Sequence, residues 1–147
     1  MNIYLASSWR NCIQPFAVKG LRLAGHTVYD FHHPRPNDNG FAWEPIDPGW
    51  RSWEPRQFID GLAHPLAQRG FGFDFKAMKL ADACLLLTPC GRSAHMEAGW
   101  MKGRGKPVVV VLEEGFEVEL MYLMFDHLCT TIDEAVEWLK VGTKRSP

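Results

Sequence analysis

The chain has 147 residues, of which 46% are hydrophobic and 12% aromatic, and its formal net charge is -1. This composition supports one folded domain with a sizeable core and excludes an intrinsically disordered chain. The near-neutral charge argues against a nucleic-acid polymer as partner, because binding a phosphate backbone requires a basic face.

Apolar runs alternate with helical patterns along the chain. Strands are predicted at residues 2–6, 27–31, 83–88, 107–112 and 127–131. Helices are predicted over about 13–24, 72–82, from near 93 to 103, and 132–140. Continuous Val and Leu strands between helices predict an α/β fold. We expect a doubly wound, five-stranded parallel sheet of the flavodoxin-like or Rossmann-like type, forming a single domain over residues 1–147.

Residues 32–57 break this alternation, with five prolines, three tryptophans and no clear period. A connection of this length in a compact domain is typically a functional lid or partly mobile. Its tryptophans either pack together as a satellite core or stack on the rings of a ligand.

The four cysteines form no CxxC pair, and no apolar run approaches the roughly 18 residues of a membrane span. We therefore expect reduced thiols in a soluble, cytoplasmic protein that has no membrane partner. His32 and His33 are adjacent, so their rings point apart in an extended chain. No metal and no other cofactor is expected.

Polar residues follow the first and third predicted strands of the crossover series, in "ASSWR" (6–10) and "PCGRS" (89–93). Because the carboxyl ends of parallel strands share one edge of the sheet, we expect both stretches at the ligand-binding rim. Together with a helix N-terminus they could hold a 5'-phosphate, or the arginines are simply solvated. The candidate binding residues are Ser7, Ser8, Arg10, Gly91, Arg92 and Ser93. For Ser93, capping of the helix N-terminus is the simpler interpretation.

Glu97 lies about one turn into the helix after the third of these strands, among small residues that include Ala94, Ala98 and Gly99. The positive end of the helix favours its charged form by roughly 0.3–1 kcal/mol. An ionised carboxylate at the ligand rim, flanked by small side chains, suits a nucleophile.

The segment "DFKAMKLADACLLLTPCGRSAHMEAGWMKGRGKPVVVV" (74–111), together with "IYLASSW" (3–9), resembles the nucleoside 2-deoxyribosyltransferase family. That family includes 2'-deoxynucleoside 5'-monophosphate N-glycosidases. The resemblance implies that Glu97 is the nucleophile, which attacks C1' of the deoxyribose and forms a covalent ester. It implies that Asp74 is the second acid, which serves the departing base or positions the sugar, and that Tyr4 approaches both sugar and nucleophile.

Many transferases of the family carry an acid in the turn before the nucleophile, whereas "TPCGRSAHM" (88–96) contains none. The base is therefore not indicated. His95 is a further candidate for substrate binding, and a satisfied structural histidine is the alternative.

The expected activity is cleavage of the N-glycosidic bond of a deoxynucleoside or deoxynucleotide, with transfer of the sugar to another base or to water. Two alternatives stay open, namely an NAD or other nucleotide glycohydrolase and a non-catalytic nucleotide-binding or sensory module. The apolar stretch 116–125 indicates a homo-oligomer, a dimer or larger, or else an ordinary core helix.

Overall fold

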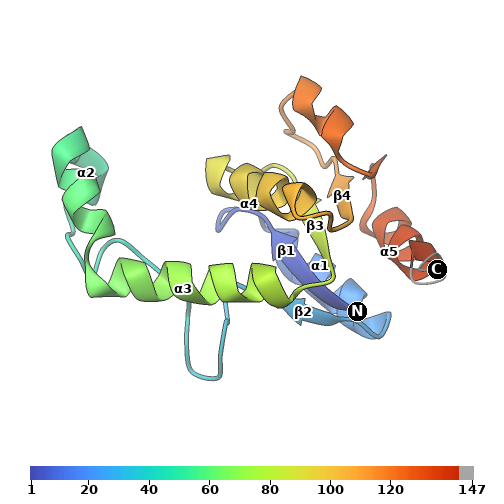
Figure 1. Ribbon diagram of the computed structural model, residues 1–147, viewed down its shortest axis with the longest axis horizontal. Helices are drawn as coiled ribbons and strands as arrows, with labels where there is room; N and C mark the ends of the chain where they lie inside the picture. The colour runs from blue at the N-terminus through green and yellow to red at the C-terminus, as the bar shows by residue number, and fades with distance from the viewer. Residues whose placement is uncertain (143–147) are drawn as a thin grey trace. The chain divides into compact units, whose positions relative to one another are not determined.

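The computed structural model describes residues 1–142 (Figure 1). The chain forms two compact units. The first consists of Met1–Asp30 and the chain from Leu80 onward, and the second is Phe31–Lys79. The single domain over residues 1–147 stays a prediction.

A five-stranded parallel sheet organises the first unit. Its order is β2-β1-β3-β4-β5, which confirms the predicted doubly wound, flavodoxin-like arrangement. The strands are β1 (Asn2–Ala6), β2 (Thr27–Tyr29), β3 (Ala83–Leu87), β4 (Val108–Val111) and β5 (His127–Cys129). All five lie within the predicted ranges.

One face of this sheet carries the apolar core. The helices α1 (Gln14–Leu23) and α5 (Ile132–Gly142) pack against it. Alternate residues of the central strands point into this layer, as the two-residue period of a strand requires. The core includes Ile3, Leu5, Leu21, Leu85, Leu87, Val109, Val111 and Leu139. Gly25 follows the end of α1, as predicted from the sequence. Its φ of 87° lies in the left-handed region that favours glycine.

The opposite face is covered by α4 (Arg92–Gly103), which lies across the strands in Figure 1. Ala94, Ala98 and Met101 are its buried residues. The small side chains let the helix backbone approach Tyr4 and Cys84, which are paired on β1 and β3. The two faces therefore differ in character, because the first holds the apolar core cluster and the second places Tyr4 and Cys84 under α4.

The second unit contains α2 (Pro55–Leu62), most of α3 (Pro65–Leu80) and the short 3-10 helix η1 (Trp50–Ser52). The helix predicted at 72–82 begins instead at Pro65. Gly70 and Gly72 weaken the helical signal of its first half, but Gly70 lies where a Cβ would come within 3.0 Å of Phe41. Close packing thus selects glycine inside this helix.

Trp43 and Trp53, two of the three tryptophans of this unit, belong to a satellite aromatic cluster, whereas the Trp50 indole N–H donates to Glu44. Trp43 packs edge-on against Trp53, Phe41 and Phe58, with ring centroids 4.7–6.0 Å apart. A Cβ on Gly61 would lie 2.6 Å from the Trp53 ring, so helix α2 packs its backbone onto that ring. Of the two expectations for these residues, the observed contacts favour the satellite core.

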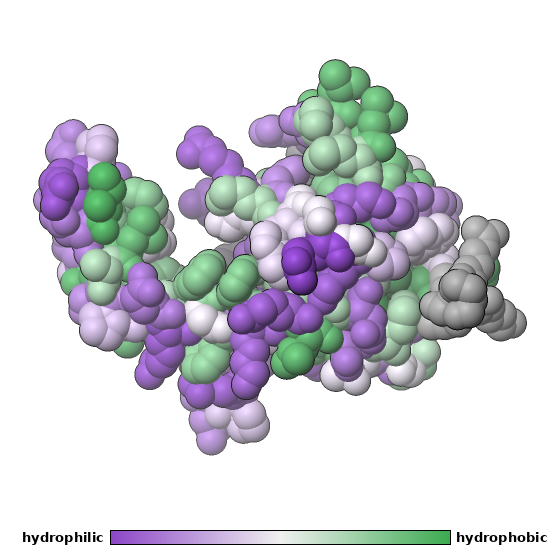
Figure 2. All heavy atoms as spheres, in the orientation of Figure 1, coloured by the Kyte–Doolittle hydropathy of each residue, from purple (hydrophilic) through white to green (hydrophobic). Residues whose placement is uncertain are grey.

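The connection after β4 is largely uncovered. Residues 120–124 form a 3-10 helix, η2 (Leu120–Met124), of which only Tyr122 is buried. Figure 2 shows the resulting apolar surface at the part of the chain drawn in orange in Figure 1. The large exposed side chains include Phe116, Val118, Leu120, Met121, Leu123 and Met124. The ordinary core helix expected as one alternative for 116–125 is therefore wrong. Within residues 1–142, no helix has the length and apolar character to span a membrane.

Candidate active site

The carboxyl ends of β1 and β3 lie side by side, at the point where the strand order reverses. Ligands of open parallel sheets bind outside such a switch point. The hydroxyl of Ser7, directly after β1, donates a 2.9 Å hydrogen bond to the carbonyl of Leu87 at the end of β3. The prediction that the two polar stretches meet at one rim is therefore confirmed.

Asn11, which is not among the residues predicted for the site, joins the loop after β1 to the loop after β3. Its side-chain amide donates to the carbonyls of Thr88 and Pro89, at 3.1 and 3.3 Å. Its side-chain oxygen accepts from the amide of Ile13 at 2.9 Å, an Asx turn just before α1. Asn11 is 5% exposed, so these bonds form out of water and fix the loop after β3 to the start of α1.

Thr88 makes a second link of the same kind. Its hydroxyl donates to the carbonyl of Val111 at 3.0 Å and accepts from the amide of Glu113 at 3.1 Å. The exit of β4 is thus tied to the exit of β3. Hydrogen bonds therefore join the ends of β1, β3 and β4 at this rim, and α4 begins directly after the loop that follows β3.

Helix α4 begins with Gly91 as its N-cap, and no side chain of the described residues caps it. The interpretation of Ser93 as the cap is therefore wrong, because Ser93 is the second helical residue and is exposed. Arg10 and Arg92 are also exposed. The hydroxyl oxygen of Ser8 accepts from the amide of Arg10 at 3.2 Å, which shapes the turn after β1.

Glu97 is partly buried on α4, three residues after Ala94 and four before Met101, both of which face the sheet. Its charge acts on two thiols. Burial, followed by the charge of Glu97, raises the pKa of Cys84. Burial and the carboxylates of Glu97 and Glu117 raise the pKa of Cys90 to about 11. Glu97 therefore lies on the side of α4 that faces the sheet, near the edge at which the parallel strands end.

Tyr4 occupies the centre of the same face. It is 1% exposed, and its ring stacks on Tyr29 with centroids 5.5 Å apart. Its partner in register is Cys84, the thiol on which the Glu97 charge acts. The structure thus brings Tyr4 and Glu97 to one side of one strand pair.

Both ring nitrogens of His95 have partners within the protein. Nδ1 lies 2.9 Å from the carbonyl oxygen of Gly91, and Nε2 lies 2.9 Å from the hydroxyl of Tyr122. Tyr122 is buried, and burial, with smaller effects of Cys90 and two glutamates, raises its pKa to about 12. His95 therefore connects α4 to η2.

Asp74 lies on α3 and is partly buried, one turn before the buried Met78. It belongs to the second unit, whereas Tyr4 and Glu97 belong to the first. Its proximity to Glu97 remains a prediction.

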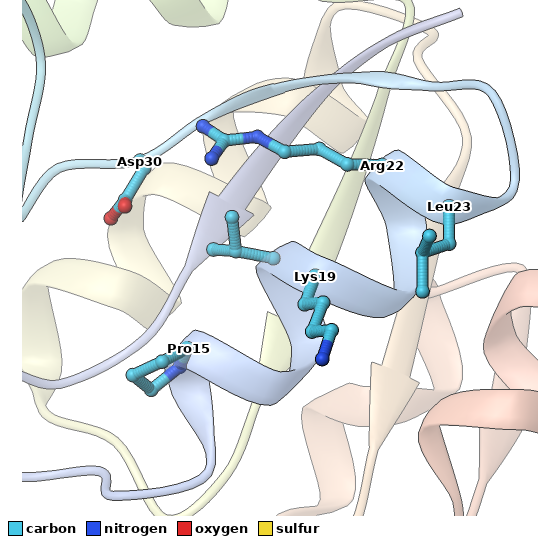
Figure 3. A pocket seen from close by; sticks show the side chains of 6 residues that line it. Pro15, Lys19, Arg22, Leu23 and Asp30 are labelled. Carbon is cyan, nitrogen blue, oxygen red and sulfur yellow. The ribbon is translucent and has the colours of Figure 1, made fainter.

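A separate hollow of about 420 Å³ lies along α1 (Figure 3). Its lining combines basic, acidic and apolar side chains, from Pro15, Val18, Lys19, Arg22, Leu23 and Asp30. None of the residues predicted for the site is among them, since α1 covers the other face of the sheet.

Solved structures of similar fold include two enzymes that act on glycosidic bonds of nucleosides or nucleotides. The 2-deoxyribosyltransferase of Bacillus psychrosaccharolyticus is 22% identical, with a TM-score of 0.64 over 92% of this chain and 90% of the other. The CMP N-glycosidase BcmB of Clostridium botulinum is 16% identical, with a TM-score of 0.52 over 96% and 99% of the two chains.

A conserved protein of Enterococcus faecalis V583 is 12% identical, with a TM-score of 0.61 over 95% of this chain and 97% of the other. No family model matches the sequence, and neither does any curated protein. At these identities the likeness establishes the fold alone.

Proposed function

We propose that the protein cleaves the N-glycosidic bond of a 2'-deoxynucleoside or deoxynucleotide and passes the sugar to another base or to water. The observation that carries this proposal is the place of Glu97. It is a carboxylate on the sheet-facing flank of α4, beside the switch point, and its charge acts on the thiol paired with Tyr4. The fold shared with a deoxyribosyltransferase and an N-glycosidase supports it.

The chemistry follows from the two carboxyl groups. A carboxylate oxygen of Glu97 attacks C1' as the bond from C1' to the base nitrogen breaks, and a glycosyl ester forms. Asp74 donates a proton to the departing base. Water or a second base then attacks C1' and gives up a proton to Asp74, the ester bond breaks, and Glu97 is released as a carboxylate. A carboxylate stabilises the positive charge that develops on the sugar, and an acid improves the leaving group.

Tyr4 serves this site by lying against the nucleophile and the sugar. Its ring is held by the stack on Tyr29, so the phenol has little freedom to turn away. A side chain that is already ordered adds no ordering cost when the substrate binds. Tyr4 is therefore proposed to orient Glu97 and the ring oxygen side of the sugar.

The substrate class we favour is the 5'-monophosphate. Arg10 and Arg92 are exposed cations on the two loops that the Ser7 bond brings together. Ser8, Gly91 and Ser93 add a hydroxyl, a backbone amide and a helix N-terminus at the same rim, and such groups bind phosphate.

Two further properties belong to this proposal. The exposed apolar surface around η2 fits a homo-oligomer, because a face of this kind is usually covered by a partner. The four free cysteines fit a reducing compartment, for which we propose the cytoplasm.

The test is an incubation with a panel of 2'-deoxynucleosides, their 5'-monophosphates and NAD, with and without an added free base, followed by chromatography. We expect base release from a deoxynucleotide. A new nucleoside or nucleotide built on the added base identifies a transferase, and base release without exchange identifies a hydrolase. Release of nicotinamide from NAD alone, or binding without turnover, would overturn the proposal.

A further inference from the structure

The hydrogen bonds of His95 fix the position of its ring proton. The Gly91 carbonyl oxygen can only accept, so Nδ1, 2.9 Å away, carries the proton and donates it. In the neutral ring Nε2 is then an acceptor, and the Tyr122 hydroxyl donates to it at 2.9 Å. The planes of the two rings are nearly parallel, with an interplanar angle of 2° and ring centroids 5.7 Å apart. Ring packing therefore accompanies the hydrogen bond between His95 and Tyr122.

The bond to Gly91 also orients the first peptide of α4. The peptide that joins Gly91 to Arg92 is planar and trans, so its carbonyl and its N–H point in opposite directions. With the carbonyl held toward His95, inside the helix, the Arg92 N–H is directed out of the helix end. As the N-cap carbonyl, the Gly91 oxygen also accepts the first backbone hydrogen bond of α4, so the His95 ring adds a second donor to a group that the helix already orients.

The bond to Tyr122 anchors the connection that follows β4. Tyr122 is 6% exposed and packs on Phe125, while its neighbours Leu120, Met121, Leu123 and Met124 are exposed. Within residues 113–125, Tyr122 is the buried residue, and its hydroxyl reaches α4. A chain segment with so little burial of its own depends on such an anchor for a defined position.

We propose that His95 is a positioning residue, which holds residues 113–125 and the first turn of α4 in one fixed arrangement beside the nucleophile Glu97. His95 does not touch the reacting atoms. It acts through Gly91, which begins the helix that carries Glu97, and through Tyr122. This inference rests on the proposed glycosidic function for its kinetic consequence, and on the hydrogen bonds alone for its structural part.

The chain offers variants that separate the two bonds. His95→Asn keeps a donor near Nδ1 and loses the acceptor at Nε2. His95→Gln supplies an acceptor near Nε2, and Tyr122→Phe removes only the hydroxyl. His127→Asn is the matched control, because His127 stacks on Trp138 on β5 and α5, away from α4.

Amide hydrogen exchange tests the structural part without any substrate. We expect faster exchange of the hydrogen-bonded amides in residues 113–125 of His95→Asn and Tyr122→Phe, which both lose the bond between His95 and Tyr122, with His95→Gln and the control close to wild type. Unchanged exchange in Tyr122→Phe overturns the proposal, since the segment would then be held by other contacts.

Kinetics at a temperature where all variants are folded test the consequence, with the deoxynucleotide that the wild-type protein cleaves best. We expect kcat to fall about three- to tenfold in His95→Asn and in Tyr122→Phe, the worth of one hydrogen bond, with KM little changed. The double variant His95→Asn/Tyr122→Phe should lose no more kcat than either single variant, because both changes break the hydrogen bond between His95 and Tyr122. Faster exchange with unchanged kcat would overturn the positioning role. A wild-type protein without turnover would count against the proposed function, while the exchange result still decides whether His95 holds the segment.

Discussion

Tyr4 and Cys84 are partners in register on the adjacent strands β1 and β3, and both lie on the sheet face that α4 covers. Burial raises the pKa of Cys84, and the charge of Glu97 on α4 raises that pKa further. Tyr4 and Cys84 therefore lie on the sheet face covered by the helix that carries Glu97.

Glu97→Gln is expected to lower base release by roughly 10³-fold or more, because an amide is not a nucleophile and the covalent route is lost. The melting temperature should stay near that of the wild type, since the amide keeps the shape of the carboxylate. Base release and thermal melting are measured on the same preparation. Glu137→Gln, on the exposed face of α5, is the control. Substantial turnover by a folded Glu97→Gln protein would exclude Glu97 as the nucleophile.

Asp74→Asn is expected to reduce base release by about 10²–10⁴-fold, the usual contribution of a general acid. A deoxyribosyl substrate with a nitrophenolate leaving group needs no proton, so its cleavage should be far less affected. The ratio of the two rates is the measurement, and Asp60→Asn on α2 is the control. Equal losses for both substrates would mean that Asp74 does not protonate the leaving group.

Arg92→Ala is expected to weaken binding of a deoxynucleoside 5'-monophosphate by roughly 1.5–3 kcal/mol, about 10- to 100-fold in Kd. Binding of the matching nucleoside should barely change. Calorimetry with both ligands measures the difference, and Arg10→Ala should behave in the same way. Arg104→Ala, at the opposite end of α4, serves as the control. A loss shared equally by nucleoside and monophosphate would argue against a phosphate contact.

The thiol of Cys90 reports on Glu97 independently of activity. Because burial and the charges of Glu97 and Glu117 raise the pKa of Cys90 to about 11, few thiolates form at pH 8.5 and alkylation should be slow. Removing the charge in Glu97→Gln lowers that pKa, so the rate of labelling by iodoacetamide should rise. Mass spectrometry of Cys90 measures the rate, with the exposed Cys12 as internal reference. An unchanged Cys90 rate would place Glu97 farther from the thiol than we infer.

Leu123→Asp should weaken self-association through the apolar surface around η2. Leu123 is 81% exposed, and burying such a side chain is worth about 1.5–3 kcal/mol, so the dissociation constant should rise roughly 10- to 100-fold. Sedimentation velocity over a concentration series measures it. Leu23→Asp, 78% exposed on α1, is the control for a new surface charge. A wild-type protein that sediments as a monomer at all concentrations would refute the oligomer.

The sheet could be predicted from the sequence because its strands are continuous apolar runs. "ACLLL" and "VVVV" are buried at every position. Continuous apolar strands of this kind indicate a parallel sheet that is covered on both faces. Helix α2 is not predicted from the sequence, because it begins inside the proline-rich stretch 32–57. Its signal was present, with Pro55 in the first turn and the Glu54 amide bonded to the Gln57 side chain.

For the site, the local part was predictable and the long-range part was not. The small residues around Glu97 are visible in one helical turn of sequence, and they do pack α4 closely on the sheet. The contacts of Asn11 with Thr88 and of His95 with Tyr122 join residues 77 and 27 positions apart. A single sequence holds no period or motif that pairs such residues, because only the folded topology brings them together.

The two faces of the sheet have a consequence for how this protein can change over generations. The side under α1 and α5 holds the apolar core cluster, whose burial stabilises the fold. The side under α4 adjoins the rim loops, where residues such as Arg10, Arg92 and Ser93 are exposed, so their substitution costs little stability. A lineage can therefore explore new substrates on one surface of its sheet while the other keeps every intermediate sequence above the threshold for folding.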